Sequence, residues 1–88
     1  MVTPTDYVSE FVYEKYIWPA LERGDKIVTI DTGEVFQALR GAYSQNFVGA
    51  VLGSTQFRET YRVRLEWAEI AATETYTFGL DVGRAILT

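Results

Sequence analysis

Residues 31–54, DTGEVFQALRGAYSQNFVGAVLGS, have the spacing of two short helices separated by a tight turn. Asp31 is a good helix N-cap, and Glu34 follows it at the capping-box position. Apolar side chains then recur at helical spacing as far as Gly41, which we expect to take the left-handed conformation that ends a helix. The segment therefore predicts a first helix that begins after Asp31 and ends at Gly41.

A second helix is predicted over residues 44–52, with Ser44 as its N-cap. Its large apolar side chains fall on one face and its small or polar side chains fall on the other, and Gly53 supplies a second stop. Two helices joined by a short turn that contains glycine match the description of a helix-turn-helix.

A longer helix is predicted before this pair, over residues 5–23, with Thr5 or Asp6 as its N-cap. Pro19 lies inside this segment. Because proline has no backbone N–H and disfavours helical geometry at the residue before it, we expect a kink or a break at this point.

Two short segments connect the helices to their neighbours. Residues 26–30, KIVTI, are rich in β-branched side chains and predict a strand that leads into the Asp31 cap. Residues 54–60 follow the second central helix, and no helix or strand is assigned to them. Their one large apolar side chain, Phe57, is expected to pack back into the core.

Beyond residue 60 the apolar side chains recur at every second position, which is typical of strands with one buried face. Two strands are predicted, over residues 61–67 and 75–82, and they form an antiparallel hairpin centred on Ala71 and Ala72. The register with one wholly apolar face pairs Val63 with Leu80, Leu65 with Phe78, Trp67 with Tyr76 and Arg62 with Asp81.

The composition is that of one small domain with ample material for a core. The chain has 88 residues, of which 48% are hydrophobic and 15% are aromatic. It contains no cysteine and no histidine, which excludes disulfides, thiolate nucleophiles, cysteine or histidine metal sites and histidine acid–base catalysis. Helix capping explains Asp31 and Glu34 without any chemistry. We therefore expect no enzyme activity, no metal site and no cofactor.

The location in the cell is predicted from two missing signals. The N-terminus lacks a basic segment followed by an apolar run, and no stretch approaches the ~20 apolar residues that a membrane span requires. The sequence therefore predicts a cytoplasmic protein with no membrane partner.

The charge is distributed unevenly along the chain. The net charge is −4 and the pI is near 4.6, which for the chain as a whole disfavours nucleic-acid binding. Residues 1–34 carry seven acids and three bases, and residues 66–88 carry four acids and one base. Residues 35–65 carry four arginines against Glu59 alone. The one basic segment thus coincides with the helix-turn-helix candidate and the strand after it.

The predicted order of helix, strand, two helices and two strands resembles that of winged helix-turn-helix domains over residues 5–83. The resemblance implies an α+β fold for a single domain over residues 1–88, in which residues 84–88 are a tail. It also implies a DNA-binding protein that regulates transcription. In that family the second helix of the pair enters the major groove and the hairpin, or wing, contacts phosphate or the minor groove, which assigns the first role to residues 44–52.

The resemblance and the basic segment together define a candidate surface for duplex DNA. Arg62 and Arg64 are expected on the solvent face of the first wing strand, beside the phosphates. Gln45 and Asn46 can hydrogen-bond adenine edges, although helix 44–52 has no arginine for guanine. The candidate residues are Arg40, Tyr43, Ser44, Gln45, Asn46, Gly49, Arg58, Arg62 and Arg64.

Several of these residues also have a purely structural explanation. Arg62 would pair with Asp81, and Arg64 would lie near Glu66 on a solvated strand face. Gly49 would allow another helix to pack closely.

Two functions therefore stay open at the level of sequence. The chain is either a DNA-binding regulator or an acidic winged-helix module that binds a protein partner, in one form by imitating nucleic acid. A homodimer is expected through the first helix and the tail, because a small domain with excess aromatic side chains ends in the apolar residues 84–88.

Overall fold

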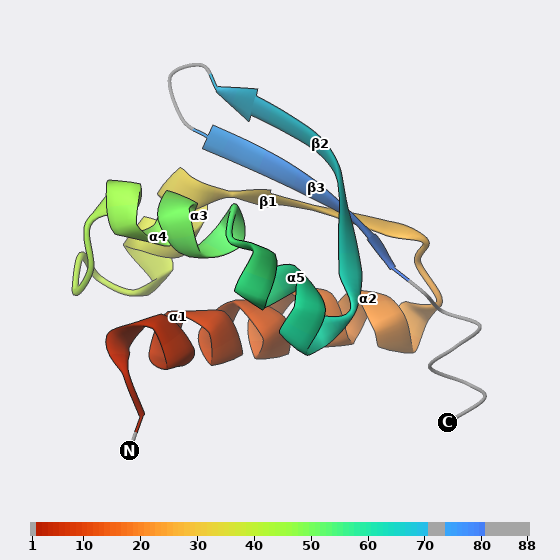
Figure 1. The fold of residues 1–88 in the computed structure, drawn as a ribbon, viewed down its shortest axis with the longest axis horizontal. Helices are drawn as coiled ribbons and strands as arrows, with labels where there is room; N and C mark the ends of the chain where they lie inside the picture. The colour runs from red at the N-terminus through yellow and green to blue at the C-terminus, as the bar shows by residue number, and fades with distance from the viewer. Residues whose placement is uncertain (1, 71–73, 81–88) are drawn as a thin grey trace.

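The fold is α+β, with a three-stranded antiparallel sheet and a layer of helices (Figure 1). The computed structural model describes residues 2–70 and 74–80. Its elements in chain order are α1 (Pro4–Val12), η1 (Tyr13–Ile17), α2 (Trp18–Arg23), β1 (Ile27–Asp31), α3 (Thr32–Ala38), α4 (Gln45–Leu52), α5 (Thr55–Tyr61), β2 (Val63–Ile70) and β3 (Glu74–Leu80). The first three form one continuous helix, so the described part of the chain has four helices, one more than the sequence predicts.

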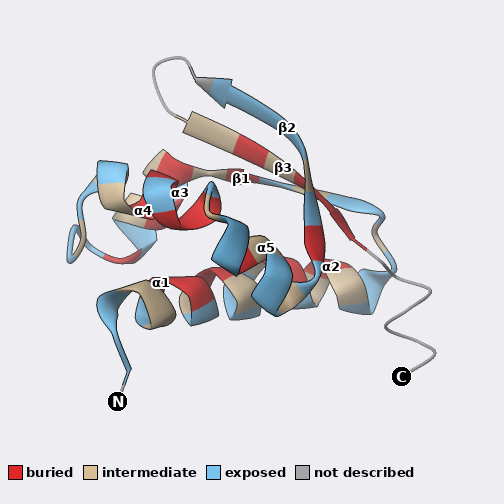
Figure 2. Ribbon diagram, viewed as in Figure 1, coloured by how far each residue is buried: buried red, intermediate tan, exposed pale blue. Residues whose placement is uncertain are grey.

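The core lies between the long first helix and the sheet. Figure 1 shows the helix formed by α1, η1 and α2 along the bottom of the molecule, the sheet above it, and α4 and α5 between them. Buried residues of the long helix, of α5 and of the sheet lie toward this space (Figure 2). The largest fully buried side chains are Phe57, Phe78, Ile17, Ile30 and Leu52.

The long helix begins earlier than predicted. The Thr3 hydroxyl accepts a hydrogen bond from the Asp6 amide (3.1 Å), and the Asp6 carboxylate accepts one from the Thr3 amide (3.4 Å). Thr3 is therefore the N-cap, and the predicted cap at Thr5 or Asp6 is wrong. Pro4 explains the difference, because its fixed φ suits the first helical position and extends the helix toward the N-terminus.

The expected defect near Pro19 is a π-helical segment rather than a break. In η1 the winding is wider, and the Trp18 amide donates to the Tyr13 carbonyl five residues earlier. Pro19 has no backbone N–H, so it cannot donate a hydrogen bond to the carbonyl of residue 15. In the wider π-helical turn, carbonyls accept hydrogen bonds from amides five residues later instead. Gly24, with a φ of 79°, then ends the helix.

The junction between β1 and α3 agrees with the sequence. The predicted strand is displaced by one residue, and Asp31, its last residue, accepts hydrogen bonds from the amides of Gly33 (2.7 Å) and Glu34 (3.4 Å) as the N-cap of α3. The helix ends at Ala38, earlier than predicted. Gly41 has the expected left-handed φ of 70°, and it shares this conformation with Arg40 (φ 55°).

The segment after α4 contains a helix that the sequence analysis missed. α4 begins as predicted, and Gly53 caps it, though with a φ of −85° rather than a left-handed one. Ser54 then caps α5, because its hydroxyl accepts from the Phe57 amide (3.2 Å) and donates to the Val51 carbonyl (2.7 Å). Phe57 is 2% exposed, which confirms that it packs into the core.

The strand β3 lies in the middle of the sheet, between β1 and β2. Both of its pairings are antiparallel, and β1 pairs with it over residues 27–31. In the β2 pairing, Val63 lies opposite Leu80 and Leu65 lies opposite Phe78. These two predicted pairs are confirmed.

The third predicted pair, Trp67 with Tyr76, is wrong. A bulge between Leu65 and Trp67 shifts the register by one residue, so that Trp67 lies opposite Thr77 and Ala68 lies opposite Tyr76. The shift turns the tryptophan away from the core, and its side chain is 63% exposed.

The predicted pairing of Arg62 with Asp81 stays a prediction, because one of its two residues lies outside the described part of the chain. Arg62 precedes β2 and forms the C-cap of α5 with a left-handed φ of 57°, while Asp81 lies outside the described residues. The predicted hairpin centre at Ala71 and Ala72 also lies outside them. The first strand of the predicted hairpin, β2, begins at Val63, two residues later than predicted.

Loss of the α5 cap tests the element that the sequence analysis missed. Ser54→Ala removes the acceptor of the Phe57 amide and the donor to the Val51 carbonyl, and we expect it to lower the free energy of unfolding by about 1 kcal/mol in urea denaturation. Thr60→Ala is the control, because Thr60 is exposed on the same helix. Its effect is expected to stay within about 0.5 kcal/mol, and equal effects of the two changes would contradict the cap.

Candidate nucleic-acid interface

The N-terminal end of α4 carries two polar side chains with different surroundings. The Gln45 amide donates to the hydroxyl of buried Thr32 (3.3 Å), which in turn donates to the Glu74 carbonyl (2.9 Å). Asn46 is exposed, and its side chain forms no hydrogen bond with residues 2–70 or 74–80. Both residues were predicted to hydrogen-bond adenine. In the structure the Asn46 side chain is exposed, whereas the Gln45 side chain is hydrogen-bonded to Thr32.

Two further candidates serve the local fold. The Ser44 hydroxyl accepts a hydrogen bond from the Phe47 amide (3.1 Å) as the N-cap of α4. The Tyr43 ring is half-buried, with ring centroids 5.9 Å from Tyr7 and 5.6 Å from Phe47. The contact between Tyr43 and Tyr7 packs the turn before α4 against the first helix. Ser44 is exposed and Tyr43 is half-buried.

Gly49 faces the sheet rather than the solvent. It is buried, and a Cβ at this position would displace the Glu74 carboxylate of β3, which is the far end of a flexible side chain. That carboxylate accepts a hydrogen bond from the Tyr76 hydroxyl (2.8 Å). Burial, together with the hydrogen bond to Glu74 and its charge, raises the pKa of Tyr76 to about 12. Gly49 therefore permits close packing, against a strand rather than against the helix that the sequence indicated.

Two of the four candidate arginines are bound within the protein. Arg58 donates to the Gly53 carbonyl (3.1 Å) and to the Thr55 hydroxyl (3.3 Å). Arg64 forms an ion pair with Glu66 (3.0 Å), which is the structural alternative that the sequence indicated. The Arg64 side chain is 63% exposed, so this pair is solvated and worth little stability.

The other two arginines are exposed. Neither Arg40 nor Arg62 forms a side-chain hydrogen bond or an ion pair with a described residue. Each stands in a turn with a left-handed backbone, one between α3 and α4 and the other between α5 and β2. In Figure 1 the first turn lies at the left edge and the second lies right of centre, so these two turns are apart.

Acidic side chains of α1 lie near the end of α5, which the sequence analysis did not find. The Tyr61 ring stacks on Tyr13, with centroids 4.5 Å apart. Burial raises the pKa of Tyr61 most, and the charges of Glu10 and Asp6 raise it further. The spacing of four between these acids was the available signal, because it places them on one helical face.

Comparison with protein-family models, with curated proteins and with solved structures gives no match to this chain. Over residues 2–70 and 74–80, no three acidic side chains are grouped as a metal site, and no helix has both the length and the apolar character needed to cross a bilayer.

The pair formed by Tyr76 and Glu74 predicts a stability change in alkaline solution. Because the pKa of Tyr76 rises from 10.0 to about 12 on folding, its neutral hydroxyl stabilises the fold fully below about pH 10. This contribution is lost as the pH rises toward 12. We expect the free energy of unfolding, measured by urea denaturation, to fall over this range, and to fall less steeply in Tyr76→Phe. Tyr7→Phe, at an exposed tyrosine, is the control, and equal slopes in the wild type and Tyr76→Phe would contradict the prediction.

Proposed function

We propose that this chain is a winged-helix domain that binds duplex DNA and regulates transcription. Its connectivity supports the proposal: β2 and β3 are consecutive antiparallel strands, β1 pairs with β3, and α3, α4 and α5 connect β1 to β2. This is the order that the resemblance to winged helix-turn-helix domains implies, with α5 as an additional helix.

The orientation of α4 is the observation that carries the proposal. Val48, Val51 and Leu52 are buried in the core, whereas Asn46 and Ala50 are exposed on the opposite side. The exposed side is free to enter a major groove without any loss of core packing. There Asn46 can hydrogen-bond an adenine edge, and a small side chain such as Ala50 can contact a thymine methyl group.

Arg40 and Arg62 supply the phosphate contacts in this proposal. Arg40 precedes α4 and Arg62 follows α5, so the two cations flank the helices that approach the DNA. Arg64 contributes less, because Glu66 already neutralises its charge. Contacts of this kind fix position and supply affinity but carry no sequence information.

Charge reversal tests the phosphate contacts. In fluorescence anisotropy titrations of a labelled random duplex at several salt concentrations, we expect Arg62→Glu to lower the affinity about tenfold at low salt. The slope of log affinity against log salt is expected to become shallower by about one. Arg40→Glu is expected to act in the same direction, and both changes should weaken different duplexes equally because phosphate contacts are independent of sequence.

The matched control is Arg23→Glu, which makes the same charge change at an exposed arginine of α2 that pairs with Asp25 (2.9 Å). Equal losses of affinity in Arg62→Glu and Arg23→Glu would show that the affinity for DNA depends only on the net charge of the protein. This result would contradict the proposed surface. Absence of binding by the wild-type chain at low salt, with a folded circular dichroism spectrum, would overturn DNA binding. That result would favour the acidic module that binds a protein partner.

A further inference from the structure

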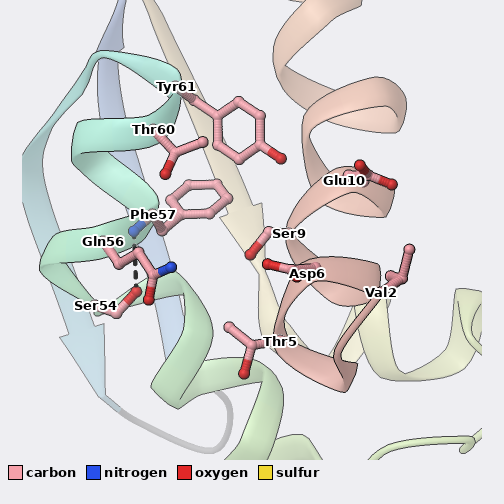
Figure 3. A pocket seen from close by; sticks show the side chains of 10 residues that line it. All are labelled: Val2, Thr5, Asp6, Ser9, Glu10, Ser54, Gln56, Phe57, Thr60 and Tyr61. Atoms are coloured by element: carbon pink, nitrogen blue, oxygen red, sulfur yellow. Dashed lines mark hydrogen bonds between the residues drawn. The ribbon is translucent and has the colours of Figure 1, made fainter.

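A cavity of about 190 Å³ opens between α1 and α5 (Figure 3). Asp6 and Ser9 of α1 line one side, and Gln56 and Tyr61 of α5 line the other. Phe57, which is 2% exposed, lies at its base. None of the residues proposed for DNA contact lines this cavity, so it is a separate surface of the molecule.

Ser9 gives the cavity a hydroxyl that the fold does not use. The residue is only 8% exposed, and its side chain forms no hydrogen bond with the described residues. Figure 3 shows the hydroxyl directed from α1 toward the space between the two helices. The hydroxyl oxygen itself is open to the cavity, so a ligand with a hydrogen-bond donor there takes the place of water on this group.

The charges around the cavity favour a cation. The Asp6 carboxylate lies toward it and accepts a long hydrogen bond from the Thr3 amide (3.4 Å), which leaves acceptor positions free. Glu10 also lines the cavity, although its carboxylate is directed away from α5 in Figure 3, and no lysine or arginine is among the lining residues in the described part of the chain. The raised pKa of Tyr61, caused first by burial and then by Glu10 and Asp6, agrees with a negative potential at this place.

We propose that this cavity binds the guanidinium group of an arginine side chain from a protein partner. The guanidinium donates hydrogen bonds to the Asp6 carboxylate, the Ser9 hydroxyl and the side-chain carbonyl of Gln56, and its flat face packs against the partly exposed ring of Tyr61. A lysine ammonium matches the charge but lacks the planar fork that serves several acceptors and stacks on a ring. The proposal does not depend on DNA binding.

The test is a titration of the full chain, labelled with ¹⁵N, with a short blocked peptide that contains one arginine. We expect chemical shift changes in the amides of the residues that line the cavity. Two matched peptides, with lysine or with neutral citrulline in place of arginine, are expected to bind more weakly, citrulline the most. Equal binding of the citrulline peptide, or shifts spread over all acidic surfaces, would overturn the proposal. Stronger binding of the lysine peptide would also overturn it.

Three variants separate the cavity from general acidity. Asp6→Asn and Ser9→Ala are each expected to weaken binding of the arginine peptide about threefold to tenfold. Glu22→Gln, an exposed acid of α2 outside the cavity, is the control and should leave the affinity unchanged. Asp6→Asn also alters the N-cap of the first helix. Ser9→Ala leaves this cap intact, so its affinity for the arginine peptide tests the cavity even if Asp6→Asn unfolds the first turn. Equal affinities of Ser9→Ala and the wild type would contradict the role of the hydroxyl.

Discussion

The buried hydroxyl of Thr32 joins three elements of this fold. It donates to the Glu74 carbonyl of β3, and it accepts from the Gln45 side chain of α4. Thr32 is fully buried and its two partners are half-buried, so both bonds are partly shielded from water. They connect the start of α4 to the sheet, while burial of Val48, Val51 and Leu52 sets which side of that helix faces inward. The exposed position of Asn46, on which the proposed reading of DNA depends, follows from this arrangement.

Features that depend on a few neighbouring residues were predictable from the sequence. Asp31 and Ser44 are N-caps because their side chains reach amides two or three residues ahead, and this requires no distant partner. The period of two after residue 62 identifies the hairpin strands, and it gives the register of Val63 and Leu65 correctly. In these places local chemistry and tertiary packing favour the same structure.

Features that depend on distant contacts were not predictable. The bulge before Trp67 exposes a large aromatic side chain that the alternating pattern assigns to the core, and a pattern of period two contains no sign of an extra residue. α5 has seven residues and one buried large apolar side chain, Phe57, which is too few for a helical period. Among the candidate site residues, Gln45 and Gly49 turn inward because of contacts with Thr32 and Glu74, and those contacts form only in the folded chain. The predicted homodimer stays a prediction.

The acidic net charge and the proposed DNA contacts are compatible because the charges act over different distances. A net charge of −4 repels a duplex at long range, and this repulsion is screened beyond about 10 Å at 0.1 M salt. In the proposed complex, Arg40 and Arg62 add short-range hydrogen bonds from their guanidinium groups to phosphate oxygens, which the net charge of the whole chain does not describe. The Tyr61 ring stacks on Tyr13 of the long helix, and Arg62 follows it in the turn that leads into β2. In the proposed DNA complex, Asn46 and Arg40 lie on the side of the duplex, and the acids that line the cavity are not among the proposed DNA contacts.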